Sequence, residues 1–120
     1  MEVDGNITYY SFDGDQIGRR IQTLILENAA QEAAVFSRNV SEAIELLTKE
    51  LQCLGCQVLF AAGDSVMAVG PPGIPIERLL SPRRGISFSV GIGKTPRDAL
   101  VALSRAKING GGHVVCYREL

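Results

Sequence analysis

The chain has 120 residues, of which 46% are apolar, and its 12 basic and 13 acidic residues leave a net charge of −1. This length and composition predict one folded domain spanning residues 1–120 and exclude an intrinsically disordered chain. The balanced charge argues against a groove for a nucleic-acid polymer, which needs a surplus of basic residues. A small nucleotide needs only a few local donors, so this class of ligand stays open.

The chain has no apolar run of the roughly 18 residues expected of a spanning helix. Its first ten residues also lack the charged-then-apolar pattern of a signal peptide. Three cysteines are a poor basis for a disulfide framework and suit a reducing compartment. We therefore expect a cytoplasmic protein.

The first half of the chain predicts a strand followed by two helices. Residues 6–12 are β-branched and aromatic, as in a strand, and they end at the acidic turn Asp13-Gly14-Asp15. Apolar residues at helical spacing predict a helix from 16 to about 26 and a second from about 29 to 53.

The second half predicts a hairpin, a short helix and two further strands separated by a helix. Residues 57–61 and 66–69 flank a second acidic turn, Gly63-Asp64-Ser65, as the two strands of a hairpin would. A short helix is expected near 76–80, a strand over 86–92, a helix that begins at Pro96 with Thr95 as its cap, and a closing strand over 113–117.

This order of elements predicts an α+β fold, a ferredoxin-like βαββαβ palm with an antiparallel sheet and helices on one face. In that topology the first strand lies beside the third, so Asp13 and Asp64 become neighbours although they are far apart in the sequence. Two carboxylates about 4 Å apart repel each other by roughly 1 kcal/mol in water and about 4 kcal/mol at an effective dielectric near 20. A cation between them removes this repulsion, and Mg²⁺ suits carboxylate and phosphate oxygens.

Three short motifs carry a resemblance to a known family. Asp13-Gly14-Asp15, Ala62-Gly63-Asp64-Ser65 in a hairpin, and Ala106-Lys107 followed by Gly110-Gly111 resemble the palm-type nucleotide cyclases. These include the GGDEF diguanylate cyclases and the polymerase subunit of type III CRISPR complexes. The sequence of residues 12–18, Phe-Asp-Gly-Asp-Gln-Ile-Gly, is most similar to that of the minimal CRISPR polymerase family, mCpol.

The resemblance implies an enzyme of bacterial anti-phage defence that makes a cyclic dinucleotide, of the cyclic di-AMP type, from nucleoside triphosphates, with ATP the expected substrate. It implies a nucleotidyltransferase with Mg²⁺ or Mn²⁺ as cofactor, no nucleic-acid polymer as partner, and indirect signalling to a membrane effector. Because one palm offers one triphosphate site, we expect a homodimer.

The site residues follow from the same resemblance. The metal ligands implied are Asp13, the carbonyl of Gly14, and Asp64; the catalytic residues are Asp13, Asp64 and Lys107. The amides of Gln16, Ile17 and Gly18 are expected to cradle the phosphates, which Lys107 neutralises. The remaining nucleotide-binding residues implied are Gly14, Asp15, Gly63 and Ser65.

Two positions depart from the cyclase pattern and keep alternatives open. Ser65 stands where most active cyclases have an acidic residue, so a fully occupied second metal position would need Asp15 to supply the missing carboxylate. Gly111 stands where an arginine is expected. One alternative is a catalytically inactive palm that senses a nucleotide. Another is a hydrolase like GTP cyclohydrolase III, which opens the ring of GTP.

Two further groups favour structural roles. Cys53-Leu54-Gly55-Cys56 has the spacing of a zinc half-site, but no second pair exists, and we interpret it as packing at a helix end. Arg83-Arg84 is predicted to be a solvated surface pair.

Overall fold

The structure is a computed structural model that describes residues 7–108 and 112–120. Its sheet has five strands in the order β2-β3-β1-β4-β5: β1 (Thr8–Gly14), β2 (Gln57–Ala62), β3 (Ser65–Gly70), β4 (Phe88–Gly93) and β5 (Val114–Cys116). The helices are α1 (Ile17–Leu26), α2 (Ala30–Cys53), α3 (Ile76–Leu79), α4 (Pro96–Ile108) and a final 3₁₀ turn, η2 (Tyr117–Glu119). None of the helices in these two segments has the length and apolarity needed to cross a bilayer.

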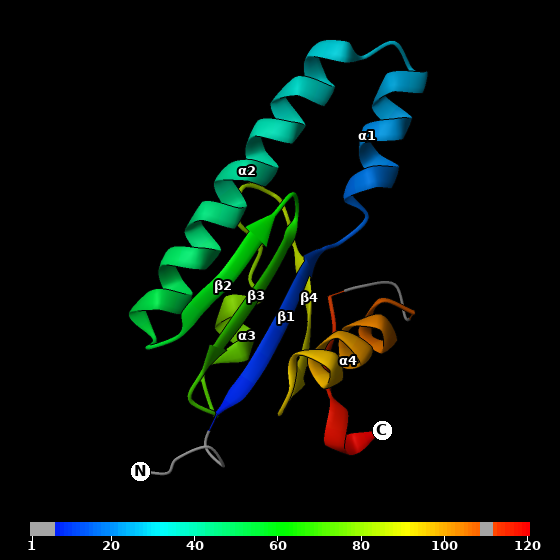
Figure 1. The fold of residues 1–120 in the computed structure, drawn as a ribbon. Helices are drawn as coiled ribbons and strands as arrows, with labels where there is room; N and C mark the ends of the chain where they lie inside the picture. The colour runs from blue at the N-terminus through cyan, green and yellow to red at the C-terminus, as the bar shows by residue number, and fades with distance from the viewer. Residues whose placement is uncertain (1–6, 109–111) are drawn as a thin grey trace.

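The predicted α+β palm is confirmed, and strands β2, β3, β1 and β4 have the ferredoxin-like order (Figure 1). β1 pairs antiparallel with both β3 and β4, which makes it the central strand. The sheet is not antiparallel throughout, because β5 adds to β4 in parallel.

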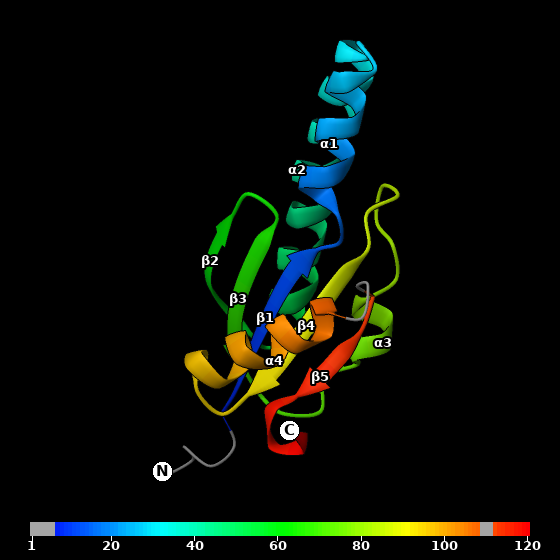
Figure 2. The same ribbon diagram turned by 90° about the vertical axis from the view of Figure 1, so that its right-hand side faces the viewer.

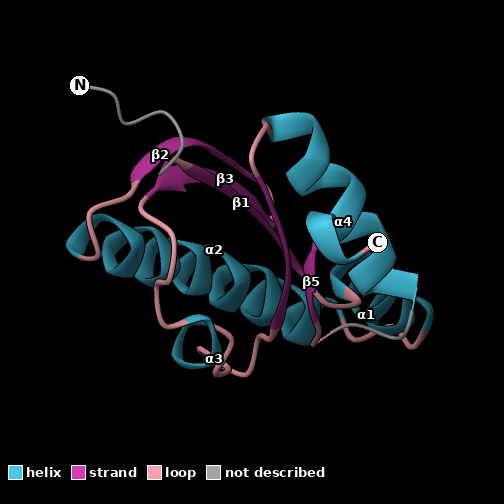
Figure 3. Ribbon diagram, turned by 90° about the horizontal axis from the view of Figure 1, so that it is seen from below, coloured by secondary structure: helices cyan, strands magenta, loops and turns pink. Residues whose placement is uncertain are grey.

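The expectation that the helices lie on one face holds for α2 and α3 but is wrong for α4. Figure 3 shows α2 and α3 on one side of the sheet and α4 on the other. Alternating side chains explain the two layers: Tyr10, Phe12 and Val90 belong to the buried core beneath α2, while α4 lies against the glycine side of β4 (Figure 2).

Glycine lets α4 approach the sheet this closely. A Cβ on Gly91 would overlap the main-chain nitrogen of Leu103 and the carbonyl oxygen of Ala99. Protein interiors are close-packed, so a helix can sit at this depth only where the facing strand has no side chain.

Helices α1 and α2 form a hairpin that extends past the end of the sheet (Figure 1). The break between them lies at Asn28, whose φ of 59° is left-handed, a conformation that asparagine tolerates at the end of a helix. Only the sheet-proximal part of α2 is anchored in the core, through residues such as Val40, Leu47 and Leu51.

Arg83 is not the solvated surface residue predicted from the sequence. Its side chain is 8% exposed, and two of its nitrogens donate to the carboxylate of Glu50 at 2.6 and 3.0 Å. Its neighbour Arg84 remains exposed and forms a surface ion pair with Glu42. Arg83 therefore joins the loop before β4 to α2, which is a structural role.

Candidate nucleotide site

The sheet brings the two acidic turns together, as the topology predicts. Asp13 is the register partner of Ser65 in the β1–β3 ladder. The amide of Gly14 donates to the carbonyl of Asp64 at 3.0 Å. A Cβ on Gly14 would lie 2.8 Å from Ile17 Cγ1 and 3.3 Å from Asp64 Cβ, so this position accepts only glycine without a shift.

Asp13 and Asp64 repel each other at this junction. Burial, and after it the negative charge of Asp13, raises the pKa of Asp64, while Lys107 acts in the opposite direction. Asp13 is already engaged, since its Oδ1 accepts a 2.6 Å hydrogen bond from the hydroxyl of Ser65. A shared cation would relieve this repulsion, and hard carboxylate oxygens suit Mg²⁺ or Mn²⁺.

Lys107 reaches the first turn from the last turn of α4. Its Nζ lies 2.7 Å from the carbonyl oxygen of Gly14, 3.2 Å from Asp13 Oδ2 and 3.3 Å from Asp15 Oδ1. Lys107 therefore places a fixed positive charge among the oxygens of the turn, in addition to complementing the helix dipole.

Asp15 is the best-bonded side chain of the site. Its Oδ2 accepts from the Ser87 hydroxyl at 2.9 Å and from the Gly112 amide at 2.8 Å. Its Oδ1 accepts from the Ser89 hydroxyl at 2.7 Å and faces Lys107. An ionised carboxylate offers about four acceptor positions, so Asp15 has none left for a metal ion in this arrangement.

The amino-terminal end of α1 faces the same place. Its first helical residue is Ile17, and its N-cap, Gln16, has a left-handed φ of 57° and no side-chain cap. The amides of a first helical turn have no carbonyl one turn back to which they can donate. Gln16, Ile17 and Gly18 thus offer donors and the positive end of the helix dipole to an anion.

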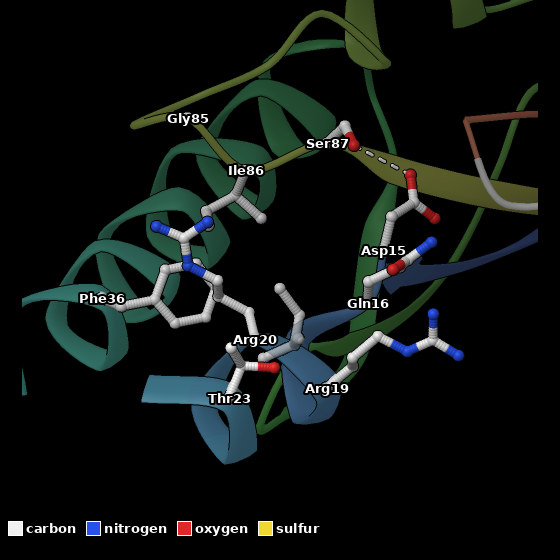
Figure 4. A pocket seen from close by; sticks show the side chains of 10 residues that line it. Asp15, Gln16, Arg19, Arg20, Thr23, Phe36, Gly85, Ile86 and Ser87 are labelled. Carbon is white, nitrogen blue, oxygen red and sulfur yellow. Dashed lines mark hydrogen bonds between the residues drawn. The ribbon is translucent and has the colours of Figure 1, made fainter. Parts of the chain in front are cut away.

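A pocket of about 380 Å³ adjoins this end of the helix (Figure 4). Its wall includes Asp15 and Gln16 near the turn and Thr23 and Phe36 from the two helices of the hairpin. The guanidinium of Arg20 lies over the ring of Phe36 at 5.8 Å from its centre. The pocket therefore has Asp15 of the first acidic turn at one end and the Arg20–Phe36 pair between α1 and α2 at the other, and neither Asp13 nor Asp64 lines it.

The remaining predicted residues are placed as follows. Gly63 opens the β2–β3 turn with a φ of 61°, and nothing lies near enough to contact a Cβ there. Gly110 and Gly111 lie outside the described residues. Within residues 7–108 and 112–120, no group of three or more His, Cys, Asp or Glu side chains is arranged to hold a metal ion. The implied set has two carboxylates and a main-chain carbonyl, so it needs water and phosphate oxygens to complete the coordination, as is usual for Mg²⁺.

Sequence reasoning missed several contributors to the site. Ser89 in β4 and Ser87 just before this strand donate hydrogen bonds to Asp15, and Phe36 lines the pocket from α2. The two serines alternate with apolar residues in a predicted strand, which indicates a polar face. Only the β1–β4 register, however, shows which residue that face meets.

Comparison with known proteins identifies the family and the fold of the chain. The family model of mCpol, the minimal CRISPR polymerase domain, matches residues 9–117. No curated protein matches the chain.

Solved structures share the fold. The GGDEF domain of DgcB from Caulobacter crescentus, in complex with c-di-GMP, is 15% identical, with a TM-score of 0.64 over 94% of this chain and 78% of that domain. The active GGEEF domain of a diguanylate cyclase from Vibrio cholerae is 16% identical, with a TM-score of 0.62 over 93% and 83%. The Csm1–Csm4 cassette in complex with cA4 is 20% identical, with a TM-score of 0.61 over 91% of this chain but only 20% of that one.

Proposed function

The chain belongs to the mCpol family, and from this membership we propose that it joins two nucleoside triphosphates into a cyclic dinucleotide. It is a nucleotidyltransferase of the palm type. The cyclic nucleotides bound to the DgcB domain and to the Csm1–Csm4 cassette support a cyclic product. We propose ATP as the substrate and a product of the cyclic di-AMP type.

One observation carries this proposal: the backbone joins the turns of Asp13 and Asp64, and the first of these turns leads directly into the open end of α1. In the reaction, a ribose hydroxyl of one nucleotide attacks the α-phosphorus of another and pyrophosphate leaves. Such a reaction needs mainly positioning and charge stabilisation. A Mg²⁺ or Mn²⁺ ion held by Asp13, the Gly14 carbonyl and Asp64 would supply Lewis-acid stabilisation of the phosphate oxygens.

The chain's other groups orient the triphosphate. The amides of Gln16, Ile17 and Gly18 receive its phosphate oxygens, and Lys107 adds a fixed positive charge on the other side of the turn. Asp15, Gly63 and Ser65 shape this end of the site. Gly63 provides the tight turn, and Ser65 holds one oxygen of Asp13.

The pocket between α1 and α2 receives the nucleoside. A volume of about 380 Å³ falls within the usual range of small-ligand sites, about 300–1,000 Å³. Phe36 and Arg20 offer an aromatic face and a planar cation, both of which stack on a nucleobase. Thr23 and Gln16 lie on the same wall and supply polar groups.

Residues 1–120 act as one palm domain, and two such palms facing each other as a homodimer would hold the two nucleotides of one product. We propose that the product is made in the cytoplasm and regulates a membrane effector in anti-phage defence. No polymer of nucleic acid is needed as template or partner.

The test is product analysis by mass spectrometry after incubation with all four nucleoside triphosphates and Mg²⁺. We expect a cyclic dinucleotide of adenosine and release of pyrophosphate. Nucleotides returned intact would support a sensing palm instead, and a ring-opened guanosine product would support a hydrolase. Either result overturns the proposal.

A further inference from the structure

We propose that Lys107 is a resident cation that takes the place of a second metal ion, so that each chain binds a single divalent ion. The inference rests on the proposed function and deepens it, because it concerns the number of metal ions at the same site. The observation that carries it is the position of the Lys107 ammonium among three oxygens of the first acidic turn.

In a two-metal site the ions lie about 3.5–4 Å apart and share bridging oxygens. Lys107 Nζ contacts two of the oxygens that the divalent ion would use, Gly14 O at 2.7 Å and Asp13 Oδ2 at 3.2 Å. Its third contact is Asp15 Oδ1 at 3.3 Å. A carbonyl oxygen and a carboxylate each have more than one lone pair, so both can serve the ammonium and a metal ion at once.

The charges of the described site agree with one divalent ion. Asp13, Asp15 and Asp64 carry three negative charges, and Lys107 carries one positive charge. The cluster thus has a formal charge of −2 before any ligand binds, and one divalent ion neutralises it. Without a bound nucleotide, a second such ion would leave an excess of positive charge close to the ammonium.

The position of the ammonium is fixed by its surroundings. Lys107 is part of α4, and α4 is seated on the glycine side of β4. Asp15, which pairs with Lys107, is itself held by the hydroxyls of Ser87 and Ser89 and by the amide of Gly112. Asp15 is therefore a positioning residue for the lysine.

Ser65 is consistent with the same inference. An acidic side chain here would add a negative charge for a second ion to neutralise, whereas the Ser65 hydroxyl donates 2.6 Å to Asp13 Oδ1. The site thus holds fewer carboxylates and, in their place, one permanent cation.

The experiment counts Mn²⁺ ions per chain by electron paramagnetic resonance of the free ion, in the absence of nucleotide. Wild type should bind one ion. Lys107→Met, which keeps the length of the side chain but not its charge, should bind a second ion at Asp13, Gly14 O and Asp15. Lys94→Met is the matched control, because Lys94 is exposed at the far end of β4, and it should bind one ion.

Two ions in wild type would overturn the inference without use of any variant, and so would a single ion in a folded Lys107→Met. An Asp64→Asn variant separates this from the proposed function. If it keeps the wild-type affinity for Mn²⁺, the proposed metal site fails, whatever Lys107 does.

Discussion

The main-chain amide of Gly14 donates a 3.0 Å hydrogen bond to the main-chain carbonyl of Asp64. The backbone therefore joins the two acidic turns, and their junction does not depend on either carboxylate. Substitution of the Asp64 side chain should accordingly change the charge of the site and leave its geometry in place.

Asp64→Asn should abolish metal-dependent activity and make the free protein more stable. The loss of a metal-binding carboxylate should lower product formation by at least about 100-fold, because even outer-shell changes cost 10–100-fold. Burial and the charge of Asp13 raise the pKa of Asp64, so the folded protein favours the uncharged form, which asparagine mimics. Thermal unfolding without divalent ions measures the stability, and mass spectrometry measures the product.

Because the pKa of Asp64 is raised in the folded protein, its charged carboxylate destabilises the fold at neutral pH. This destabilisation decreases as the pH falls and more of Asp64 is protonated. The advantage of Asp64→Asn over wild type should therefore shrink in mildly acidic buffer. A variant that is less stable than wild type at neutral pH would show that the Asp64 side chain holds the turn together.

Asp15→Asn, unlike Asp64→Asn, should make the protein less stable, and this should be its main effect. The carboxylate of Asp15 accepts hydrogen bonds from Ser87, Ser89 and Gly112 and pairs with Lys107. An amide has one acceptor oxygen and two donor hydrogens, so it cannot satisfy these partners. We expect a loss of about 2–4 kcal/mol in the free energy of unfolding, measured in urea.

Asp98→Asn is a suitable control, because Asp98 pairs with Arg97, whose side chain is 74% exposed. A surface pair of this kind contributes little to stability, because solvent screens it. If Asp15→Asn matched this control in stability but lost Mn²⁺ binding, Asp15 would be a metal ligand and not a positioning residue.

Gly91→Ala should destabilise the protein by displacing α4. The added methyl group would overlap backbone atoms of Leu103 and Ala99, which cannot rotate away as a side chain can. We expect a loss of at least about 2 kcal/mol in the free energy of unfolding. Since Lys107 is on α4, the activity of any folded fraction should also decrease.

Gly18→Ala provides the comparison for stability, because Gly18 lies in α1 with open space around it. Alanine should stabilise this helix by roughly 0.5–1 kcal/mol. Equal effects of the two substitutions would mean that α4 does not pack against β4 as closely as described.

The sequence was sufficient to predict the junction of the acidic turns, because chain order determines it: a βαββαβ unit places its first strand beside its third. It was not sufficient to place α4. Gly91 and Gly93 alternate along β4 and indicate a face without side chains. Nothing local, however, shows that this face is the one opposite α2, since an amphipathic helix fits either side.

Local sequence patterns were likewise not sufficient to predict contacts between segments that are distant in the chain. Arg83 has the sequence context of a surface loop, yet it is buried through Glu50, 33 residues earlier in the chain. The stacking of Arg20 on Phe36 depends on where α1 ends and α2 begins around Asn28, because this determines which residues of the two helices face each other. Both require the three-dimensional path of the hairpin and the loop.

Tyr10→Phe should remove part of the sensitivity of the fold to alkaline pH. Tyr10 is 1% exposed, and its hydroxyl donates to the carbonyl of Pro71 at 2.6 Å. Burial, and after it the charge that Cys56 acquires at high pH, raises the pKa of Tyr10 from 10.0 to about 12. The stability that comes from keeping the phenol neutral is complete below pH 10 and is lost as the pH rises through 12.

A shift of this size corresponds to a loss on the order of 2–3 kcal/mol between pH 10 and 12. Urea unfolding at pH 9, 10, 11 and 12 should therefore show a steeper decline for wild type than for Tyr10→Phe. Below pH 10, wild type should be the more stable of the two, because phenylalanine leaves the Pro71 carbonyl without its donor.

Tyr9→Phe serves as the control, since the side chain at position 9 lies on the opposite face of β1. Parallel curves for wild type and Tyr10→Phe would show that the hydroxyl does not titrate within the fold and that other groups cause the alkaline unfolding.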